Sequence, residues 1–173
     1  MKETLKIISS NIRFDNINDG DHIWDNRKHI LRDSIQSFGP QILGTQEGRQ
    51  PQLSSLNSLL DDQSIIDGHR AWIKERMYPS LFLNSKDLDL KKSGDIWLSE
   101  TPFVPGSKSF GSVFPRLCSW ASVLWNQSHR SEGVPLLIVN CHLDHVLEET
   151  RNMQVEVLCK EVLKLRNEKE HLI

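Results

Sequence analysis

Short apolar segments that end in polar side chains recur along the 173-residue sequence. The segment LLIVNCHLDH, at 136–145, has four apolar residues followed by an asparagine, a cysteine and two histidines. The segment LKIISSNIRF, at 5–14, leads into Asn11. In the same way, PQILGTQEG, at 40–48, leads into Glu47. Apolar runs of this length are typical of buried strands, so we expect a sheet whose strand ends carry polar groups.

Segments with the periodicity of an amphipathic helix lie between these strands. Residues 26–38 carry apolar side chains at positions i, i+4 and i+7, and the Gly-Pro pair that follows predicts the end of a helix. Pro51 suits the first turn of a second helix, and a third helix is expected from Glu148 onward. The first strand has apolar residues on both faces, which predicts an inner strand. Further strand-like segments lie at 69–76, 80–84, 94–99 and 116–126.

This order of elements bounds the fold class. Strands cluster in the middle of the chain and helices lie between the outer strands, so the fold is α+β or a layered α/β sandwich. A chain of this length suits one domain, and we expect residues 1–173 to form it. With 38% hydrophobic and 25% charged residues, the composition is that of a globular protein rather than a disordered one.

The sequence predicts a cytoplasmic protein without a membrane segment. The N-terminus has charges at Lys2, Glu3 and Lys6, where a signal peptide needs an apolar run. No apolar stretch approaches the length of a membrane span. The three cysteines have no paired short spacing, which disfavours a disulfide framework or a cysteine zinc site and favours a reducing compartment.

Three polar strand ends are candidate site residues, namely Asn11, Glu47 and His142. A sheet holds such side chains rigidly while they face a cleft, as a precise site requires. For each residue alone, a cap, a solvated charge or a structural histidine is the competing explanation. Strand alternation puts His142 and Asp144 on one face and His145 on the other, so we do not expect the two histidines to bind one zinc ion.

Ordered motifs along the chain carry a family resemblance. They are SSNIRFDN (9–16), WDNRKHIL (24–31), PQILGTQEG (40–48), GDIWLSETP (94–102), PRLCSWA (115–121) and NCHLDH (140–145). In this order and spacing they resemble the endonuclease/exonuclease/phosphatase superfamily, and the fourth and fifth resemble a bacterial branch of it. The resemblance covers nearly the whole chain. It implies a metal-dependent hydrolase of phosphate esters with an α/β/β/α sandwich of two packed mixed sheets.

The resemblance implies roles for the residues that match the family motifs. Glu47 matches the metal-binding glutamate, and Asn11 matches a catalytic asparagine that ligates or orients the metal. His142 matches the catalytic histidine near the scissile phosphate, with Cys141 in place of the usual threonine. Mg²⁺ is the expected cofactor and Mn²⁺ the alternative, because a hard cation that keeps several waters needs few protein oxygens.

Three further residues are expected to bind the substrate or shape its pocket, namely Arg116, Asp144 and His145. Arg116 is a candidate phosphate contact through charge-assisted, bidentate hydrogen bonds, with a surface ion pair as the competing explanation. Asp144 and His145 are expected to tune His142 or to shape the pocket around it.

The resemblance also identifies what the sequence lacks. Family members carry a G-D-x-N motif after the histidine strand, whose aspartate activates the attacking water. No such motif follows residue 145 here. Loss of a general base typically slows catalysis about 10²–10⁴-fold. We therefore expect a sandwich that is incomplete at its C-terminus. The chain is then a truncated enzyme, one completed by a partner, or a catalytically inactive binding module.

The substrate class is open at the level of the sequence. The superfamily implies nucleic acids, inositol phosphates or sphingolipids, and the fold does not choose among them. The formal net charge of −2 gives no general reason for tight binding to nucleic acid. We expect a small phosphate ester, with nucleic acid as the alternative.

Overall fold

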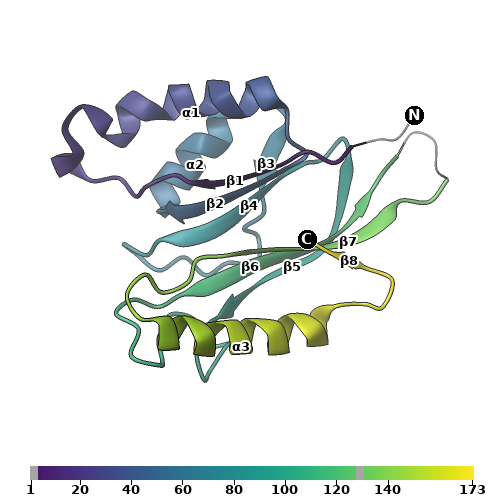
Figure 1. The fold of residues 1–173 in the computed structure, drawn as a ribbon. Coiled ribbons are helices and arrows are strands. Elements are labelled where there is room, and N and C mark those ends of the chain that lie inside the picture. The colour runs from purple at the N-terminus through teal and green to yellow at the C-terminus, as the bar shows by residue number, and fades with distance from the viewer. Residues whose placement is uncertain (1–3, 128–130) are drawn as a thin grey trace.

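The computed structural model describes residues 4–127 and 131–173, so the charged Lys2 and Glu3 lie outside the described residues. Within this part of the chain, two four-stranded sheets pack face to face. Two helices cover the outer face of the first sheet and one covers the outer face of the second (Figure 1). The fold is thus an α+β sandwich with four layers, α/β/β/α, as the sequence predicted.

The first sheet contains parallel and antiparallel neighbours. Its order is β1 (Ile7–Asn11), β2 (Ile42–Gly48), β4 (Tyr78–Asn84) and β3 (Gln63–Ile65). Strand β1 pairs in parallel with β2, and the other pairs are antiparallel. Outside this sheet lie the 3₁₀ helix η1 (Ile17–His22), helix α1 (Trp24–Phe38) and helix α2 (Gln50–Leu59).

The second sheet is also mixed. Its order is β5 (Leu88–Trp97), β6 (Leu117–Trp125), β7 (Val134–Cys141) and β8 (His171–Leu172). The first three strands are antiparallel, and β8 adds to β7 in parallel. Helix α3 (Glu148–Leu165) covers the outer face (Figure 1).

Strand alternation divides the core into three apolar layers. In β4, Phe82 joins the cluster under α1 and α2, while Leu81 and Leu83 join the cluster between the sheets. In β7, Leu137 packs toward α3 and Ile138 faces the first sheet. Each such side chain, when fully buried, contributes roughly 1.5–3 kcal/mol. The core thus fixes both sheets and the strand ends between them.

A buried asparagine joins the two sheets. Asn140 of β7 donates from Nδ2 to the backbone oxygens of Thr45 and Ser80, both at 2.9 Å, and accepts from Gln46 Nε2 at 2.8 Å. Gly44 leaves room for it, since a Cβ there would lie 3.2 Å from Asn140 Cγ. These bonds hold the end of β2 against the end of β7.

Three expectations about the elements are wrong. The segment 69–76 is not a strand, because Arg70 within it is tied by hydrogen bonds to the second sheet. Strand β1 lies at an edge of its sheet rather than inside it, and its Ile7 is 40% exposed. The alternation of 140–145 does not extend to His145, because β7 ends at Cys141. No helix in the described part of the chain is long and apolar enough to cross a membrane.

Candidate active site

Glu47 lies in a strained stretch at the end of β2. The pairing of β2 with β4 shifts register between Thr45 and Gly48, which marks a β-bulge. Glu47 itself has a φ of 67°, a left-handed conformation that side chains rarely adopt. Gly48 then allows α2 to pack closely, since a Cβ there would lie 2.5 Å from Leu53 Cδ2. Strain of this kind gathers at functional sites.

Asn11 supports the Glu47 carboxylate. It is the last residue of β1, and the parallel register places it opposite Gln46 of β2. Asn11 Nδ2 donates to Glu47 Oε1 at 2.8 Å, and its Oδ1 accepts from the backbone N–H of Arg13 at 2.9 Å. Arg27 of α1 donates to the backbone oxygen of Arg13 at 2.7 Å and so holds the chain that leaves β1. The structure therefore brings the two predicted residues together.

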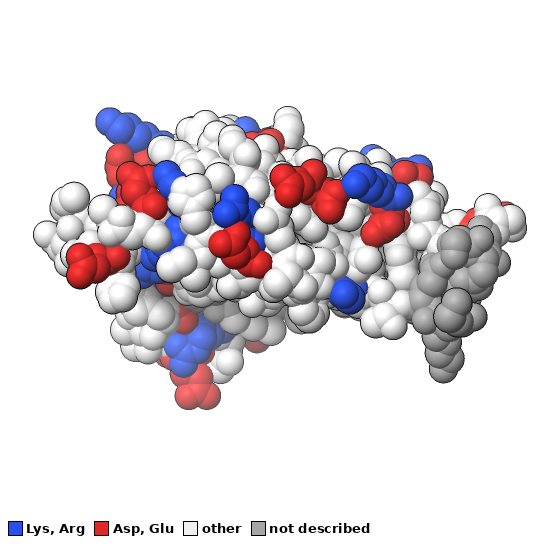
Figure 2. Space-filling model, turned by 90° about the horizontal axis from the view of Figure 1, so that it is seen from above, with Lys and Arg blue, Asp and Glu red and all other residues white. Residues whose placement is uncertain are grey.

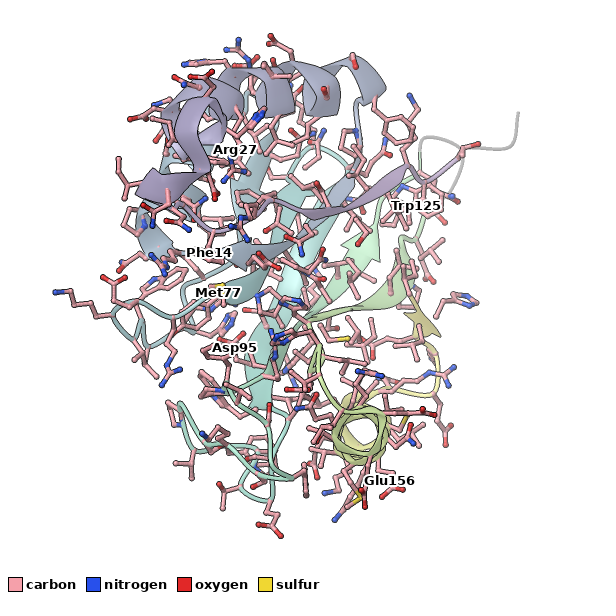
Figure 3. The ribbon with its side chains drawn as sticks, turned by 60° about the vertical axis from the view of Figure 1, so that its left-hand side comes forward. Phe14, Arg27, Met77, Asp95, Trp125 and Glu156 are labelled. Carbon is pink, nitrogen blue, oxygen red and sulfur yellow. The ribbon has the colours of Figure 1, made fainter. Side chains whose placement is uncertain are left out.

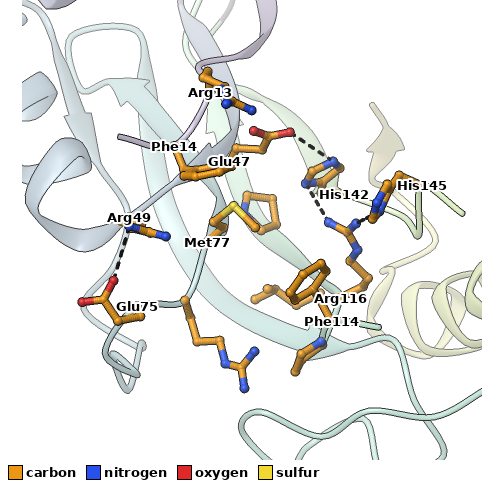
Figure 4. Close-up of a pocket in the computed structure, with 14 residues that line it drawn as sticks. Arg13, Phe14, Glu47, Arg49, Glu75, Met77, Phe114, Arg116, His142 and His145 are labelled. Carbon is orange, nitrogen blue, oxygen red and sulfur yellow. Dashed lines mark hydrogen bonds and ion pairs between the residues drawn. The ribbon is translucent and has the colours of Figure 1, made fainter. Parts of the chain in front are cut away.

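His142, Arg116 and His145 meet at the end of the second sheet. The backbone N–H of His142 donates to the carbonyl of Leu117 at 3.3 Å, so that His142 lies beside Arg116. The distances are 3.2 Å from Arg116 Nη1 to His142 Nδ1 and 2.9 Å from Nη2 to His145 Nδ1. His142 Nε2 is 4.0 Å from Glu47 Oε1, so a side chain that follows the second sheet approaches one from the first sheet (Figure 4).

These residues line one pocket of about 520 Å³. Figure 3 shows Phe14 and Met77, which also line it, at the same end of the sandwich. Four arginines and two glutamates are among the described residues that line the pocket, so cations are in excess. Such a pocket attracts an anion. The charged lining residues are Arg13, Arg49, Arg76, Arg116, Glu47 and Glu75.

The pocket arginines differ in their partners. Arg13 forms an ion pair with Asp19 at 2.9 Å, and Arg49 forms one with Glu75 at 3.3 Å (Figure 4). Among the ion pairs of the described residues, none involves Arg116, although the residue is only 6% exposed. Because a guanidinium keeps its proton at physiological pH, the charge of Arg116 is present and is not neutralised by a carboxylate of the described residues.

The same surroundings affect the pKa of His142. Burial lowers this pKa, and the positive charge of Arg116 lowers it further, while Glu47 raises it. The net direction is downward, so the imidazole is neutral at neutral pH. Burial also lowers the pKa of Arg116, against the opposing effect of Asp144 and Glu47.

Asp144 is not among the pocket-lining residues. It is 3% exposed and accepts hydrogen bonds from the backbone N–H of Val146 at 2.8 Å, from that of Leu147 at 3.1 Å and from Ser112 Oγ at 2.9 Å. Burial raises the pKa of Asp144, but these bonds outweigh it and lower the pKa overall. Asp144 thus orders the turn into α3 beside the pocket.

Sequence reasoning missed several lining residues. Arg13 and Phe14 stand inside a quoted motif, and the φ of 54° at Arg13 marks the same strain as at Glu47. Arg49 follows that glutamate by two residues. No local pattern marks Arg76 or the other residues that the loops bring to the pocket, because their approach is set by tertiary structure. No group of three His, Cys, Asp or Glu in the described part of the chain is placed to hold a metal ion.

Comparison with known proteins finds no match by sequence and several similar solved structures. No family model matches the sequence, and no curated protein matches it significantly. A mannosyl-6-phosphatase of Bacteroides thetaiotaomicron is 28% identical with a TM-score of 0.87, over 98% of this chain and 64% of that one. An endonuclease/exonuclease/phosphatase of Bacteroides vulgatus is 26% identical with a TM-score of 0.86, over 95% and 62%.

A more distant likeness shows the fold alone. TDP2 of D. rerio, solved with a single-strand DNA product, is 17% identical with a TM-score of 0.72, over 97% of this chain and 58% of that one. The chain spans less than two thirds of each of these three proteins. The four-layered sandwich, the ordered motifs and these likenesses agree, and the chain is similar in fold to proteins of the endonuclease/exonuclease/phosphatase family.

Proposed function

We propose that the chain carries the substrate pocket of a metal-dependent phosphoesterase. The observation that carries this proposal is the meeting of Glu47 from the first sheet with His142 from the second, 4.0 Å apart, in a pocket with excess arginine. A carboxylate for a cation, a neutral imidazole and a buried guanidinium are the groups that phosphate-ester hydrolysis uses. The family supports the same reaction class.

Glu47 and Asn11 are the proposed metal residues. Their oxygen donors suit Mg²⁺ or Mn²⁺, and a single carboxylate is enough for an ion that keeps several waters and binds the substrate phosphate. Asn11 Nδ2 already fixes Glu47 Oε1 at 2.8 Å, so the carboxylate is held before an ion binds. A bound divalent cation supplies charge neutralisation at the phosphoryl oxygens.

His142 and Arg116 act on the phosphate from the opposite side of the pocket. Hydrogen-bond donors and a fixed positive charge stabilise the negative charge that develops on the phosphoryl oxygens in the transition state. Arg116 supplies the charge, which no carboxylate of the described residues pairs. His142 supplies a neutral donor, since its pKa is lowered.

A small phosphate ester is the proposed substrate, with nucleic acid as the alternative. The pocket volume of about 520 Å³ is in the range of small-ligand sites. Figure 2 shows acidic and basic side chains interspersed on the face seen from above, without a continuous basic stretch over the described residues. The mannosyl-6-phosphatase, at 28% identity, supports a small ester more than the distant DNA-bound protein supports nucleic acid.

A catalytically inactive binding module is the second proposal. Glu75, the other carboxylate that lines the pocket, is engaged by Arg49. Arg116 contacts Nδ1 of both histidines. Apart from Glu47, the proposed metal ligand, every carboxylate that lines the pocket in the described part of the chain is therefore paired, which leaves no further carboxylate there to take a proton from water. We propose the cytoplasm as the location, supported by three free cysteines.

One experiment on the 173-residue chain distinguishes the two proposals. With Mg²⁺ and bis-p-nitrophenyl phosphate, the enzyme proposal predicts turnover that chelation abolishes and Glu47→Gln removes. The binding proposal predicts binding of inorganic phosphate by calorimetry without turnover. Arg32→Gln, on α1 and outside the pocket lining, is the matched control and should leave both readouts unchanged. Neither turnover nor phosphate binding would contradict both proposals.

A further inference from the structure

Arg116 contacts two imidazole rings at once. Its Nη1 and Nη2 lie 3.2 Å from His142 Nδ1 and 2.9 Å from His145 Nδ1, and the whole residue is 6% exposed. His142 directly follows β7, which ends at Cys141, and His145 comes three residues later; Figure 4 shows the guanidinium of Arg116 between the two rings. One side chain therefore fixes both histidines of the HLDH motif.

The chemistry of the guanidinium decides which ring nitrogens carry protons. A guanidinium has five N–H donors and no acceptor. Both Nδ1 atoms must therefore accept, because an N–H on either one would oppose the N–H of Arg116. A ring that accepts at Nδ1 is neutral and carries its proton on Nε2. The contact thus assigns the same tautomer to both histidines.

Independent contacts hold each member of this group in place. The carbonyl of Arg116 accepts from the backbone N–H of Leu98 at 2.8 Å, so the start of β6 is anchored. The ring of His145 stacks on Phe114, with centroids 6.3 Å apart and planes inclined by 23°. Both histidines line the pocket, and His142 Nε2 faces Glu47.

We propose that Arg116 is a positioning residue that fixes His142 and His145 as a pair of neutral donors, each with its proton on Nε2. This is a task beyond its contact with phosphate. The consequence for phosphate rests on the proposed function: both pocket-lining rings then offer an N–H donor at Nε2 before the ester binds. Lysine cannot replace Arg116 in this task, because one ammonium group is a point donor and lacks the planar fork that reaches both rings.

The test is nitrogen NMR of the chain with ¹⁵N-labelled histidine at about pH 8, above the ordinary histidine pKa. In the wild-type chain, we expect His142 and His145 to show a protonated Nε2 and a hydrogen-bonded, unprotonated Nδ1. In Arg116→Met, the Nδ1 signals of both rings should move toward the position of a nitrogen without a hydrogen bond. In Arg116→Lys, at most one of the two Nδ1 signals should keep its wild-type position.

A matched control is Arg76→Met, which removes another pocket arginine. Arg76 contacts neither histidine, so both Nδ1 signals should keep their wild-type positions. A wild-type signal from a protonated Nδ1 in either ring overturns the proposal, and this reading needs no variant to fold. Unchanged Nδ1 signals in a folded Arg116→Met chain overturn it as well.

The same samples separate this proposal from the proposed function. Inorganic phosphate is titrated into the wild-type chain, and hydrolysis of bis-p-nitrophenyl phosphate is measured with Mg²⁺. If the tautomers are as expected but phosphate neither binds nor is hydrolysed, the proposed function fails and the positioning role of Arg116 stands. If phosphate binds but the tautomers differ, the positioning role fails and the proposed function stands.

Discussion

Two buried arginines of this sandwich are in opposite electrostatic situations. The fully buried side chain of Arg70 donates to both carboxylate oxygens of Asp95, at 2.8 and 2.9 Å, and to Ser80 Oγ and Ser119 Oγ at 2.9 and 2.6 Å. Arg116 reaches only neutral imidazole nitrogens, and its Nε has no hydrogen-bond partner among the described residues. One charge is neutralised within the fold, and the other is not.

This difference in pairing indicates that Arg70 stabilises the fold, whereas the charge of Arg116 has no partner within it. A buried charge is costly unless it is paired, and loss of its partner destabilises a protein strongly. Arg70 therefore ties the loop after β3 to the second sheet through its ion pair with Asp95 of β5. Arg116 has no carboxylate partner among the described residues, and under the proposed function a phosphate supplies the missing anion.

The largest expected effect is on the paired arginine. Arg70→Met leaves Asp95 buried without its cation, and we expect the free energy of unfolding to fall by about 3–5 kcal/mol. Urea unfolding followed by circular dichroism measures it. Arg76→Met, a pocket arginine that is not fully buried, is the control and should change stability by less than about 0.5 kcal/mol. A loss below about 1 kcal/mol for Arg70→Met would show that the pair does not hold the fold.

Acid should weaken the same pair. Burial raises the pKa of Asp95, but contacts with His69, Arg70 and Ser119 outweigh it and lower this pKa from 3.8 to about 2. Because the folded-state pKa is the lower one, the stabilisation is fully present above 3.8 and is lost as the pH falls through about 2. The shift corresponds to about 2 kcal/mol. Urea midpoints measured from about pH 5 to about pH 2 should show this loss, and Asp95→Asn should remove this part of the pH dependence.

The contrast between these arginines also shows how far the sequence leads. Apolar periodicity predicted α1, α2, α3 and the strands that carry Asn11 and Glu47, because these elements bury regular stripes of side chains. The family motifs predicted which residues gather at the strand ends. Neither predicted Arg70, whose segment resembles a strand in composition but is fixed by polar contacts to residues far along the chain.

The turn after Cys141 exposes a second limit of sequence reasoning. Alternation assigned His142 and His145 to opposite faces, whereas both reach Arg116. A strand pattern applies only while the backbone stays extended, and Asp144 turns the chain by accepting two backbone N–H bonds. The sequence contained Asp144, but its acceptor role depends on a turn that local patterns did not reveal.

The unpaired arginine should affect ligand binding more than stability. Arg116→Met removes a buried, unpaired charge, so we expect the free energy of unfolding to change by less than about 1 kcal/mol. Binding of inorganic phosphate should weaken about 10- to 100-fold, the value of a hydrogen bond to a charged group. Calorimetry and urea unfolding of the same sample measure both. A large loss of stability with unchanged phosphate binding would reverse the assignment of the two arginines.

The smallest expected effect concerns Arg49. Like Arg70 it has a carboxylate partner, and like Arg116 it lines the pocket. Its partner Glu75 is 67% exposed, so their ion pair at 3.3 Å contributes little to folding. Glu75→Gln should leave stability within about 1 kcal/mol of wild type, and it removes a negative charge from the pocket rim. Phosphate binding should then strengthen by a factor of about five or less, with the gain disappearing at high salt. Weaker binding in Glu75→Gln would mean that Glu75 orients Arg49 for the ligand, and the pocket would then depend on paired as well as unpaired arginines.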